Sequence, residues 1–167
     1  NVTINRGTAA KGKTCVGSGN LLMESVHVAH DAFVGNDCII GNGTKLAGEI
    51  IIDDHAIISA NVLMHQFCRV GGYTMVGGGT RFSQDIPPYT ICAREPVAYC
   101  GLNLVGLRRR GFSNELIENI HNAYRIIYQG GVPLNEALQK VREEVPASPE
   151  IDYIIEFIEN SKRGFVH

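Results

Sequence analysis

Aliphatic side chains recur at every sixth residue along the first half of the chain. The series is unbroken and consists of Val16, Leu22, Val28, Val34, Ile40, Leu46, Ile52, Ile58, Met64, Val70 and Val76. A helix repeats about every 3.6 residues and a strand every two, so neither produces this period. A period of six is typical of a triangular coil, in which each flat side takes six residues and directs one side chain to the axis.

The rest of the repeat unit is built for tight corners. The residue after each aliphatic is often small, as at Gly17, Ala29, Gly35, Gly41, Ala47, Ser59, Gly71 and Gly77. We therefore predict a mainly β fold, a left-handed parallel β-helix of hexapeptide repeats over residues 1–88, whose sides stack coil on coil. Ordinary strands joined by turns are the alternative, but they would not keep one phase over so long a stretch.

Helical periodicity replaces the six-residue repeat in the second half of the chain. Pro87 and Pro88 interrupt the repeat, and we expect residues 89–104 to form a connecting segment. Residues 105–167 then predict a C-terminal α-helical domain. Ser113 is a candidate N-cap for its first long helix, and Ser148 followed by Pro149 is a candidate start for its last.

Composition limits the cellular setting. The chain has 167 residues, a net charge of −2 and five cysteines without a CxxC pair, so we infer neither a disulfide framework nor a zinc knuckle. Cys38 and Cys68 fall in the small-residue position of the repeat and predict buried thiols. No segment reads as a signal peptide or a membrane span, which fits a reducing cytoplasm. Because the chain starts at Asn1 and already reads as extended structure there, we expect it to be the later part of a longer protein.

Histidine is the residue type that points to chemistry. Three hexapeptides complete one coil, so residues eighteen apart should stack on the same side. His30 should then stack near Gly48, and Gly48 near Gln66, while His27 and His65 flank the same edge of the prism. The repeat therefore predicts one edge that is rich in imidazole groups.

These residues fit more than one chemistry. A neutral histidine can remove a proton from a hydroxyl at neutral pH, the adjacent Asp31 can orient the His30 ring, and a backbone N–H near Gly48 can receive an oxyanion. Alternatively, three histidines are enough for a zinc site with one open position. Surface hydrogen bonding is the plainest interpretation, and spacing alone leaves all three open.

Four segments carry a resemblance to a known family. They are VTINRGT at the start, NLLMESVHVAHDAFVGNDCIIGNGTKLAGE from residue 20, LMHQFCRVGGYTMVGGGTRFSQDIPPY from residue 63, and GLNLVGLRRRGFS from residue 101. In this order and spacing they strongly resemble the UDP-N-acetylglucosamine O-acyltransferase family, the first enzymes of lipid A biosynthesis. Family members are longer at the amino end.

The resemblance implies a reaction and a catalytic group. The family transfers an (R)-3-hydroxyacyl chain from acyl carrier protein to the 3-hydroxyl of UDP-N-acetylglucosamine. His30, assisted by Asp31, matches the general base, and Gly48 matches the residue whose N–H serves the oxyanion. His27 and His65 match active-site histidines.

Further positions match the substrate contacts of the family. Gln66 matches a residue beside the sugar and acyl group, and Asn103, Arg109 and Arg110 match positions that hold the nucleotide sugar or lie near it. Gly78 matches the position that limits acyl length, and a glycine there implies a longer chain. The arginines also suit a diphosphate and an acidic carrier protein. An apolar groove for the acyl chain can be drawn from Leu22, Met23, Ile39 and Met75.

The resemblance also sets expectations for cofactors and partners. It implies no metal and no bound cofactor, because the acyl donor arrives on the phosphopantetheine of acyl carrier protein. It implies a homotrimer with active sites between subunits, no nucleic-acid partner and no stable membrane insertion. Two positions depart from the family: Glu49 stands where histidine is common, and Asn5 where another member carries histidine. Both bear on acceptor contacts, including a 3-hydroxyl against a 3-amino sugar.

Three other functions compete with this one. A metal-dependent hexapeptide enzyme of the γ-carbonic anhydrase type would bind stoichiometric zinc. A hexapeptide acetyltransferase would prefer acetyl-CoA to acyl carrier protein. A noncatalytic scaffold would have no use for the histidine-rich edge.

Overall fold

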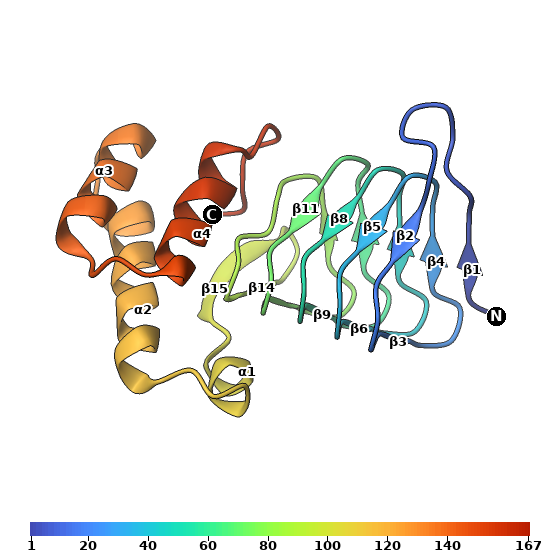
Figure 1. Cartoon of the computed structure of the whole chain (residues 1–167), viewed down its shortest axis with the longest axis horizontal. Coiled ribbons are helices and arrows are strands. Elements are labelled where there is room, and N and C mark those ends of the chain that lie inside the picture. Colours follow the sequence, from blue (N-terminus) through green and yellow to red (C-terminus); the bar gives the residue numbers. More distant parts are fainter.

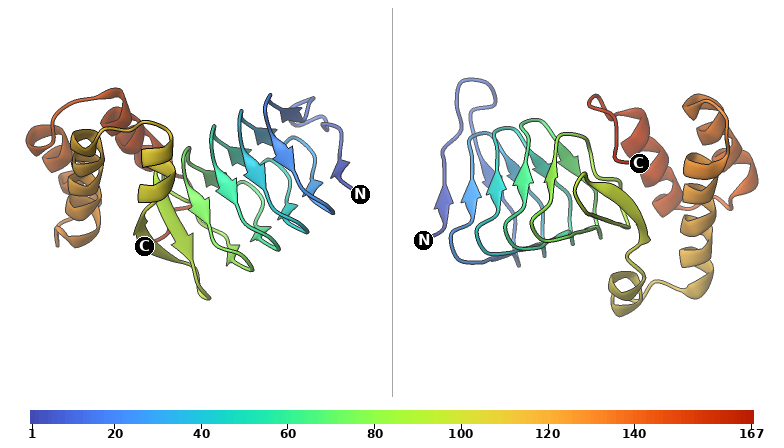
Figure 2. Two further views of the ribbon diagram at one scale, coloured as in Figure 1. Left: turned by 90° about the horizontal axis from the view of Figure 1, so that it is seen from below. Right: turned by 180° about the vertical axis from the view of Figure 1, so that it is seen from behind.

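The computed structural model describes residues 1–167 as a parallel β-solenoid followed by a cluster of helices (Figure 1). The amino terminus lies at the end of the solenoid remote from the helices, and the chain coils steadily toward them. Two further views show the solenoid side-on, with the helices stacked at its far end (Figure 2). The elongated shape follows from the repeat, because each coil contacts only its neighbours.

Three parallel sheets form the sides of the solenoid, and we name them A, B and C. Sheet A contains β1 (Thr3–Ile4), β4 (His27–Val28), β7 (Lys45–Leu46), β10 (Leu63–Met64) and β13 (Arg81–Phe82). Sheet B contains β2 (Cys15–Val16), β5 (Phe33–Val34), β8 (Ile51–Ile52) and β11 (Arg69–Val70). Sheet C contains β3 (Leu21–Leu22), β6 (Ile39–Ile40), β9 (Ile57–Ile58), β12 (Met75–Val76), β14 (Thr90–Ala93) and β15 (Ala98–Leu102).

The strand register confirms the predicted stacking. His27 pairs with Lys45, and Lys45 with Leu63, so equivalent residues lie eighteen apart on adjacent coils. The second residue of each two-residue strand points inward, and Val28, Leu46 and Ile58, for example, are fully buried. The repeat therefore builds one continuous aliphatic core, and the first residue of each strand faces outward.

This geometry predicts a large difference between inward and outward leucines. Leu46 is fully buried in the solenoid core, whereas Leu134 on the helical part is 42% exposed. We expect Leu46→Ala to lower the free energy of unfolding by about 3 kcal/mol, because it opens a cavity in a close-packed core. Leu134→Ala, the matched control, should cost less than about 1 kcal/mol. Urea denaturation followed by circular dichroism measures both, and equal losses would contradict the inward assignment.

Residues 89–104 do more than connect the two parts. β14 pairs in parallel with β12, with Met75 opposite Ile91, and so adds a last rung to sheet C. β15 then folds back antiparallel to β14. The six-residue period does not predict this rung, because Val76 pairs with Cys92, only sixteen residues later. The coil is already shortened between Phe82 and Ile86, since Met64 pairs with Phe82 but Val70 with Ile86.

Four helices follow, α1 (Leu104–Arg109), α2 (Asn114–Gln129), α3 (Leu134–Glu144) and α4 (Pro149–Glu159). Both predicted caps are confirmed: the Ser113 hydroxyl accepts from the Leu116 N–H at 3.1 Å, and that of Ser148 from the Ile151 N–H at 3.3 Å. None of the helices combines the length and the apolar character needed to cross a bilayer.

The helices have their own core, and the chain then returns to the solenoid. Val166 is buried within the solenoid core, and Phe165 forms a bridge with Asp85. These residues cover the last coil, which would otherwise expose apolar side chains and unpaired strand edges. Cys38 and Cys68 are buried as predicted, and desolvation raises the pKa of the Cys68 thiol to about 11.

Candidate active site at the edges of the solenoid

The edge between sheets A and B gathers most of the predicted catalytic residues. His30, Gly48 and Gln66 occupy equivalent corners of three successive coils, just after β4, β7 and β10. A Cβ built on Gly48 would lie 2.6 Å from His30 Nε2, so the ring packs directly on the glycine backbone. A side chain at position 48 would displace the His30 ring, and the contact confirms that His30 and Gly48 stack.

His30 is held in a defined tautomer. Its Nδ1 lies 2.9 Å from Asp31 Oδ2, and because a carboxylate can only accept, Nδ1 carries the proton. Nε2 is therefore the basic nitrogen, and the ring is partly exposed. Asp31 is 3% exposed, and hydrogen bonds from Thr8, and then from His30, lower its pKa to about 2. The carboxylate consequently stays ionised over the whole range in which histidine titrates.

Two further histidines flank this edge on sheet A. His27 faces outward from β4, and its Nδ1 lies 2.7 Å from the Thr3 hydroxyl. His65 follows β10 directly, and its Nδ1 donates to the Gln66 carbonyl at 3.0 Å. That bond places the proton of neutral His65 on Nδ1 and leaves Nε2 as an acceptor. The predicted gathering of imidazole groups along one edge is thus present in the structure.

The predicted nucleotide-binding residues lie on a different edge, between sheets B and C. Arg110 Nη1 donates to His55 Nδ1 at 2.8 Å, and Asn103 Nδ2 donates to the Tyr73 carbonyl at 3.0 Å. Asn103 also caps α1, and Arg109 is exposed at the end of that helix. His55 and Tyr73 occupy equivalent corners of consecutive coils, which the eighteen-residue spacing could have indicated.

Gly78 lies on the third edge, between sheets C and A. A Cβ placed there would meet Ala60 O at 3.4 Å, an ordinary contact, so the glycine leaves room at this corner. The residues that the sequence assigns to one site are therefore distributed over three edges of one chain. A single copy does not bring them together.

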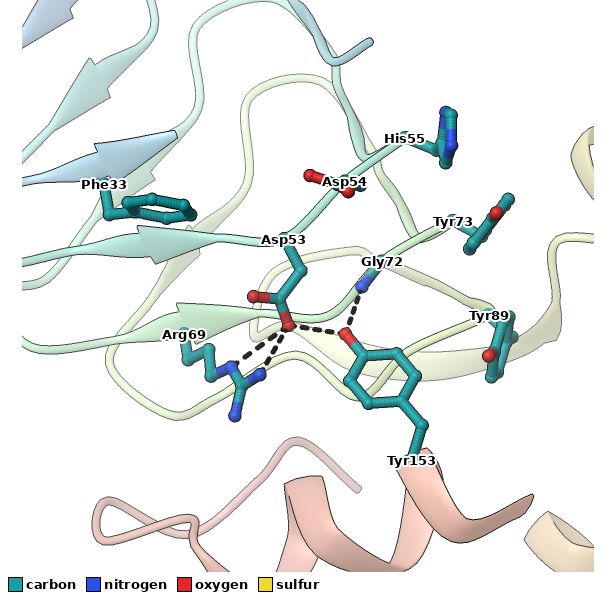
Figure 3. Close-up of a pocket in the computed structure, with 9 residues that line it drawn as sticks. All are labelled: Phe33, Asp53, Asp54, His55, Arg69, Gly72, Tyr73, Tyr89 and Tyr153. Carbon is teal, nitrogen blue, oxygen red and sulfur yellow. Dashed lines mark hydrogen bonds and ion pairs between the residues drawn. The ribbon is translucent and has the colours of Figure 1, made fainter. Parts of the chain in front are cut away.

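A pocket of about 360 Å³ opens beside the B/C edge, where α4 meets sheet B (Figure 3). Asp53 Oδ2 accepts from Arg69 Nη2 at 2.8 Å and from the Tyr153 hydroxyl at 2.5 Å. The Tyr153 oxygen in turn accepts from the Gly72 N–H at 2.8 Å. The polar groups at the base of this pocket are thus satisfied by one another and tie α4 to the solenoid.

Comparisons with known proteins agree with the resemblance. A family profile described as "Udp N-acetylglucosamine O-acyltransferase; Domain 2" matches residues 85–166. The chain is also 40% identical over 166 residues to the acyl-[acyl-carrier-protein]–UDP-N-acetylglucosamine O-acyltransferase of Aliivibrio salmonicida. The chain is therefore similar to UDP-N-acetylglucosamine O-acyltransferases over nearly its whole length. The alignment covers 99% of this chain and 63% of that relative, so the chain spans less than two thirds of its length.

Solved structures of the family have the same fold. The UDP-N-acetylglucosamine acyltransferase from Bacteroides fragilis 9343 superimposes with a TM-score of 0.97 at 72% identity, over 99% of this chain and 65% of that one. The enzyme from Francisella novicida superimposes with a TM-score of 0.94 at 36% identity, over 99% and 61%. The predicted solenoid with its helical tail is therefore confirmed as the family architecture.

These relatives are acyltransferases by name. Within this single chain, no three His, Cys, Asp or Glu side chains are grouped so that they could hold a metal ion.

Proposed function

We propose that this chain carries the catalytic edge of an acyltransferase that moves an (R)-3-hydroxyacyl chain from acyl carrier protein to the 3-hydroxyl of UDP-N-acetylglucosamine, the first step of lipid A biosynthesis. The observation that supports this most strongly is the His30–Asp31 pair packed on Gly48. In this arrangement His30 is a base of fixed tautomer, and the backbone of Gly48 lies close to its basic nitrogen, Nε2.

The mechanism follows from this geometry. His30 Nε2 takes the proton of the sugar hydroxyl as its oxygen attacks the thioester carbonyl. The Gly48 N–H donates to the resulting oxyanion. When the intermediate collapses, the carbon–sulfur bond breaks, and the phosphopantetheine thiolate takes the proton from the His30 imidazolium. Asp31 stabilises that imidazolium, and neither a metal nor a bound cofactor takes part.

We further propose that the protein works as a homotrimer whose subunits meet through sheet C. The outward residues of that sheet are all apolar and stack in register: Leu21, Ile39, Ile57, Met75 and Ile91. None is fully buried, and Leu21 is 53% exposed. A continuous apolar stripe of this kind is typical of a subunit interface.

A cyclic arrangement explains why the site residues are distributed over three edges. If sheet C of one subunit faces sheet A of the next, the B/C edge of the first lies beside the A/B edge of the second. Arg109 and Arg110 then face the His30 of the neighbouring subunit, while buried Asn103 holds the start of α1 in place beside them. Gly78, on the C/A edge, falls near the three-fold axis at the deep end of the same interface.

Each substrate then has a place in this interface. Arg109 and Arg110 bind the diphosphate of the nucleotide, for which the guanidinium fork is suited, while His27, His65 and Gln66 line the sugar and acyl side. The acyl chain runs between the sheets, along Met23, Ile39 and Met75, toward Gly78, and the open corner there supports a long chain. The run of arginines also attracts the acidic carrier protein. We place the reaction in the cytoplasm, where the five free cysteines would remain reduced.

A transfer assay tests the proposal. The protein is incubated with UDP-N-acetylglucosamine and a series of 3-hydroxyacyl carrier proteins of graded length, with the Bacteroides fragilis enzyme as a positive control. Transfer to the 3-hydroxyl, strongest with a long acyl chain, is the expected result. A preference for acetyl-CoA, or zinc-dependent activity, would instead favour the competing functions.

A further inference from the structure

We propose that the loop Gly7–Thr14 positions the general base, with Thr8 as the residue that fixes the Asp31 carboxylate and thereby the tautomer of His30. This inference rests on the proposed function, because it concerns the same histidine. The loop projects from the solenoid between β1 and β2 (Figure 1). The sequence predicts only that these residues leave the repeat as a loop. The role that we propose for the loop is argued from its contacts in the structure.

Thr8 holds both carboxylate oxygens of Asp31. The Thr8 hydroxyl donates to Oδ2 at 2.5 Å, and its backbone N–H donates to Oδ1 at 2.9 Å. Together these bonds fix the rotation of the carboxylate about its own axis. Oδ2 is also the oxygen that accepts from His30 Nδ1 at 2.9 Å. Thr8 and His30 therefore share one acceptor, and the position of the first determines the geometry of the second.

The other end of the loop holds the backbone of the same residue. The Thr14 hydroxyl accepts from the Asp31 N–H at 2.9 Å. Asp31 has a φ of 60°, in the left-handed region where a non-glycine residue needs support from its surroundings. The two threonines at the ends of the loop thus clamp Asp31 from both its backbone and its side chain.

The two ends of the loop are in contact with each other. A Cβ on Gly7 would lie 2.1 Å from Lys13 N, so the two sides of the loop touch where it leaves the solenoid. Gly12, with a φ of 77°, donates its N–H to the Thr8 carbonyl at 2.7 Å. These contacts make the loop a compact unit that can hold Thr8 in place.

One ion pair ties the loop to the next coil. Lys11 Nζ lies 3.6 Å from a carboxylate oxygen of Glu49, the residue that follows Gly48. Glu49 replaces a common family histidine, so in this chain that position anchors the loop. Asp31 is the charged group in direct contact with the His30 ring.

The fixed carboxylate matters because the two nitrogens of a neutral imidazole compete for one proton. The proton resides on the nitrogen that has the better acceptor beside it. With Asp31 held toward Nδ1, the proton stays there and Nε2 remains a base. If the carboxylate rotates away, the ring shifts toward the tautomer that carries its proton on Nε2 and cannot accept one from substrate.

The test compares Thr8→Val, which removes the hydroxyl at nearly constant volume, with Thr8→Ser, which keeps it. Thr8 is exposed and its backbone N–H is retained, so we expect both variants to fold. The tautomer of His30 is measured in each by the ¹⁵N chemical shifts of the imidazole nitrogens, and the pKa of Asp31 by the ¹³C shift of its carboxyl group. His30→Ala assigns the His30 signals.

The expected result is a change that only the valine variant shows. In Thr8→Val the Nδ1–H tautomer of His30 should fall from nearly complete to a mixture, and the pKa of Asp31 should rise from about 2 toward its ordinary value of 3.8. Thr8→Ser should match the wild type. Where transfer is measured, kcat should fall roughly tenfold in Thr8→Val with KM unchanged, as expected for the loss of one hydrogen bond to a charged group.

Two outcomes would count against the inference in different ways. An unchanged His30 tautomer in Thr8→Val would overturn the positioning role, whatever the activity. A shifted tautomer with unchanged transfer would support the positioning of His30 but would contradict its proposed function as the base. The NMR arm needs no turnover, so the two failures are distinguishable.

Discussion

His30→Ala is expected to lower the rate of acyl transfer on the order of 10³-fold. The variant removes the group that takes the proton of the attacking hydroxyl, and general-base catalysis contributes about 10²–10⁴ in comparable enzymes. KM for the nucleotide sugar should change little, because the proposed role of His30 is at the reacting oxygen and not at the diphosphate. The measurement is steady-state transfer from 3-hydroxyacyl carrier protein at several concentrations of UDP-N-acetylglucosamine.

His30→Gln is the matched control for the shape of the site. Glutamine keeps a polar side chain of similar reach beside Asp31 and Gly48 but cannot accept the proton, so its loss should equal that of alanine. Size-exclusion chromatography and thermal unfolding should be unchanged in both variants, because the ring is at the surface edge and not in the core. Near-normal transfer by either variant would remove His30 from the role of base.

The second large effect tests whether each active site is formed by residues of two neighbouring subunits. A variant with Arg109→Ala and Arg110→Ala should lose about 100-fold or more in kcat/KM, because two hydrogen-bonding charges are removed from the proposed diphosphate site. His30→Ala loses activity through the opposite edge. When the two inactive variants are mixed and reassembled in equal amounts, about one quarter of the interfaces combine an intact A/B edge with an intact B/C edge.

Transfer should therefore recover to about a quarter of the wild-type value in the mixture, although neither variant is active alone. Mixing without reassembly is the control and should give no recovery. The same absence of recovery after verified reassembly would mean that His30 and the arginines serve one site within a single chain. The structure argues against that outcome, because Arg110 contacts His55 on the B/C edge while His30 lies on the A/B edge.

The local contacts of the solenoid were largely predictable. Every inward aliphatic from Val16 to Val76 followed from the six-residue period, and the stacking of His30 on Gly48 followed from three hexapeptides per coil. The caps of α2 and α4 were visible as Ser113 and Ser148. These features are short-range, so each is encoded by residues that lie close in sequence or at one fixed spacing.

Features that break the repeat were not predictable in this way. The last rung, β14, lies out of phase because the preceding coil is shorter. The tie between Asp53 and Tyr153 joins residues one hundred positions apart, and no period relates them. The role of Thr8 was not predictable either, because no sequence pattern relates a threonine in a surface loop to the carboxylate of Asp31, to which its hydroxyl donates.

The sequence by itself determined the triangular coil, its core and the histidine-rich edge, because a strict repeat converts position in the chain directly into position on the prism. It also carried the family resemblance, through motifs whose order and spacing are specific. The tertiary structure decided which edge each remaining residue occupies, since Asn103 and Arg110 reach the solenoid only through the packing of α1. It likewise decided that Thr8 and Thr14 close on Asp31, because the path of a loop depends on the contacts it makes rather than on any period.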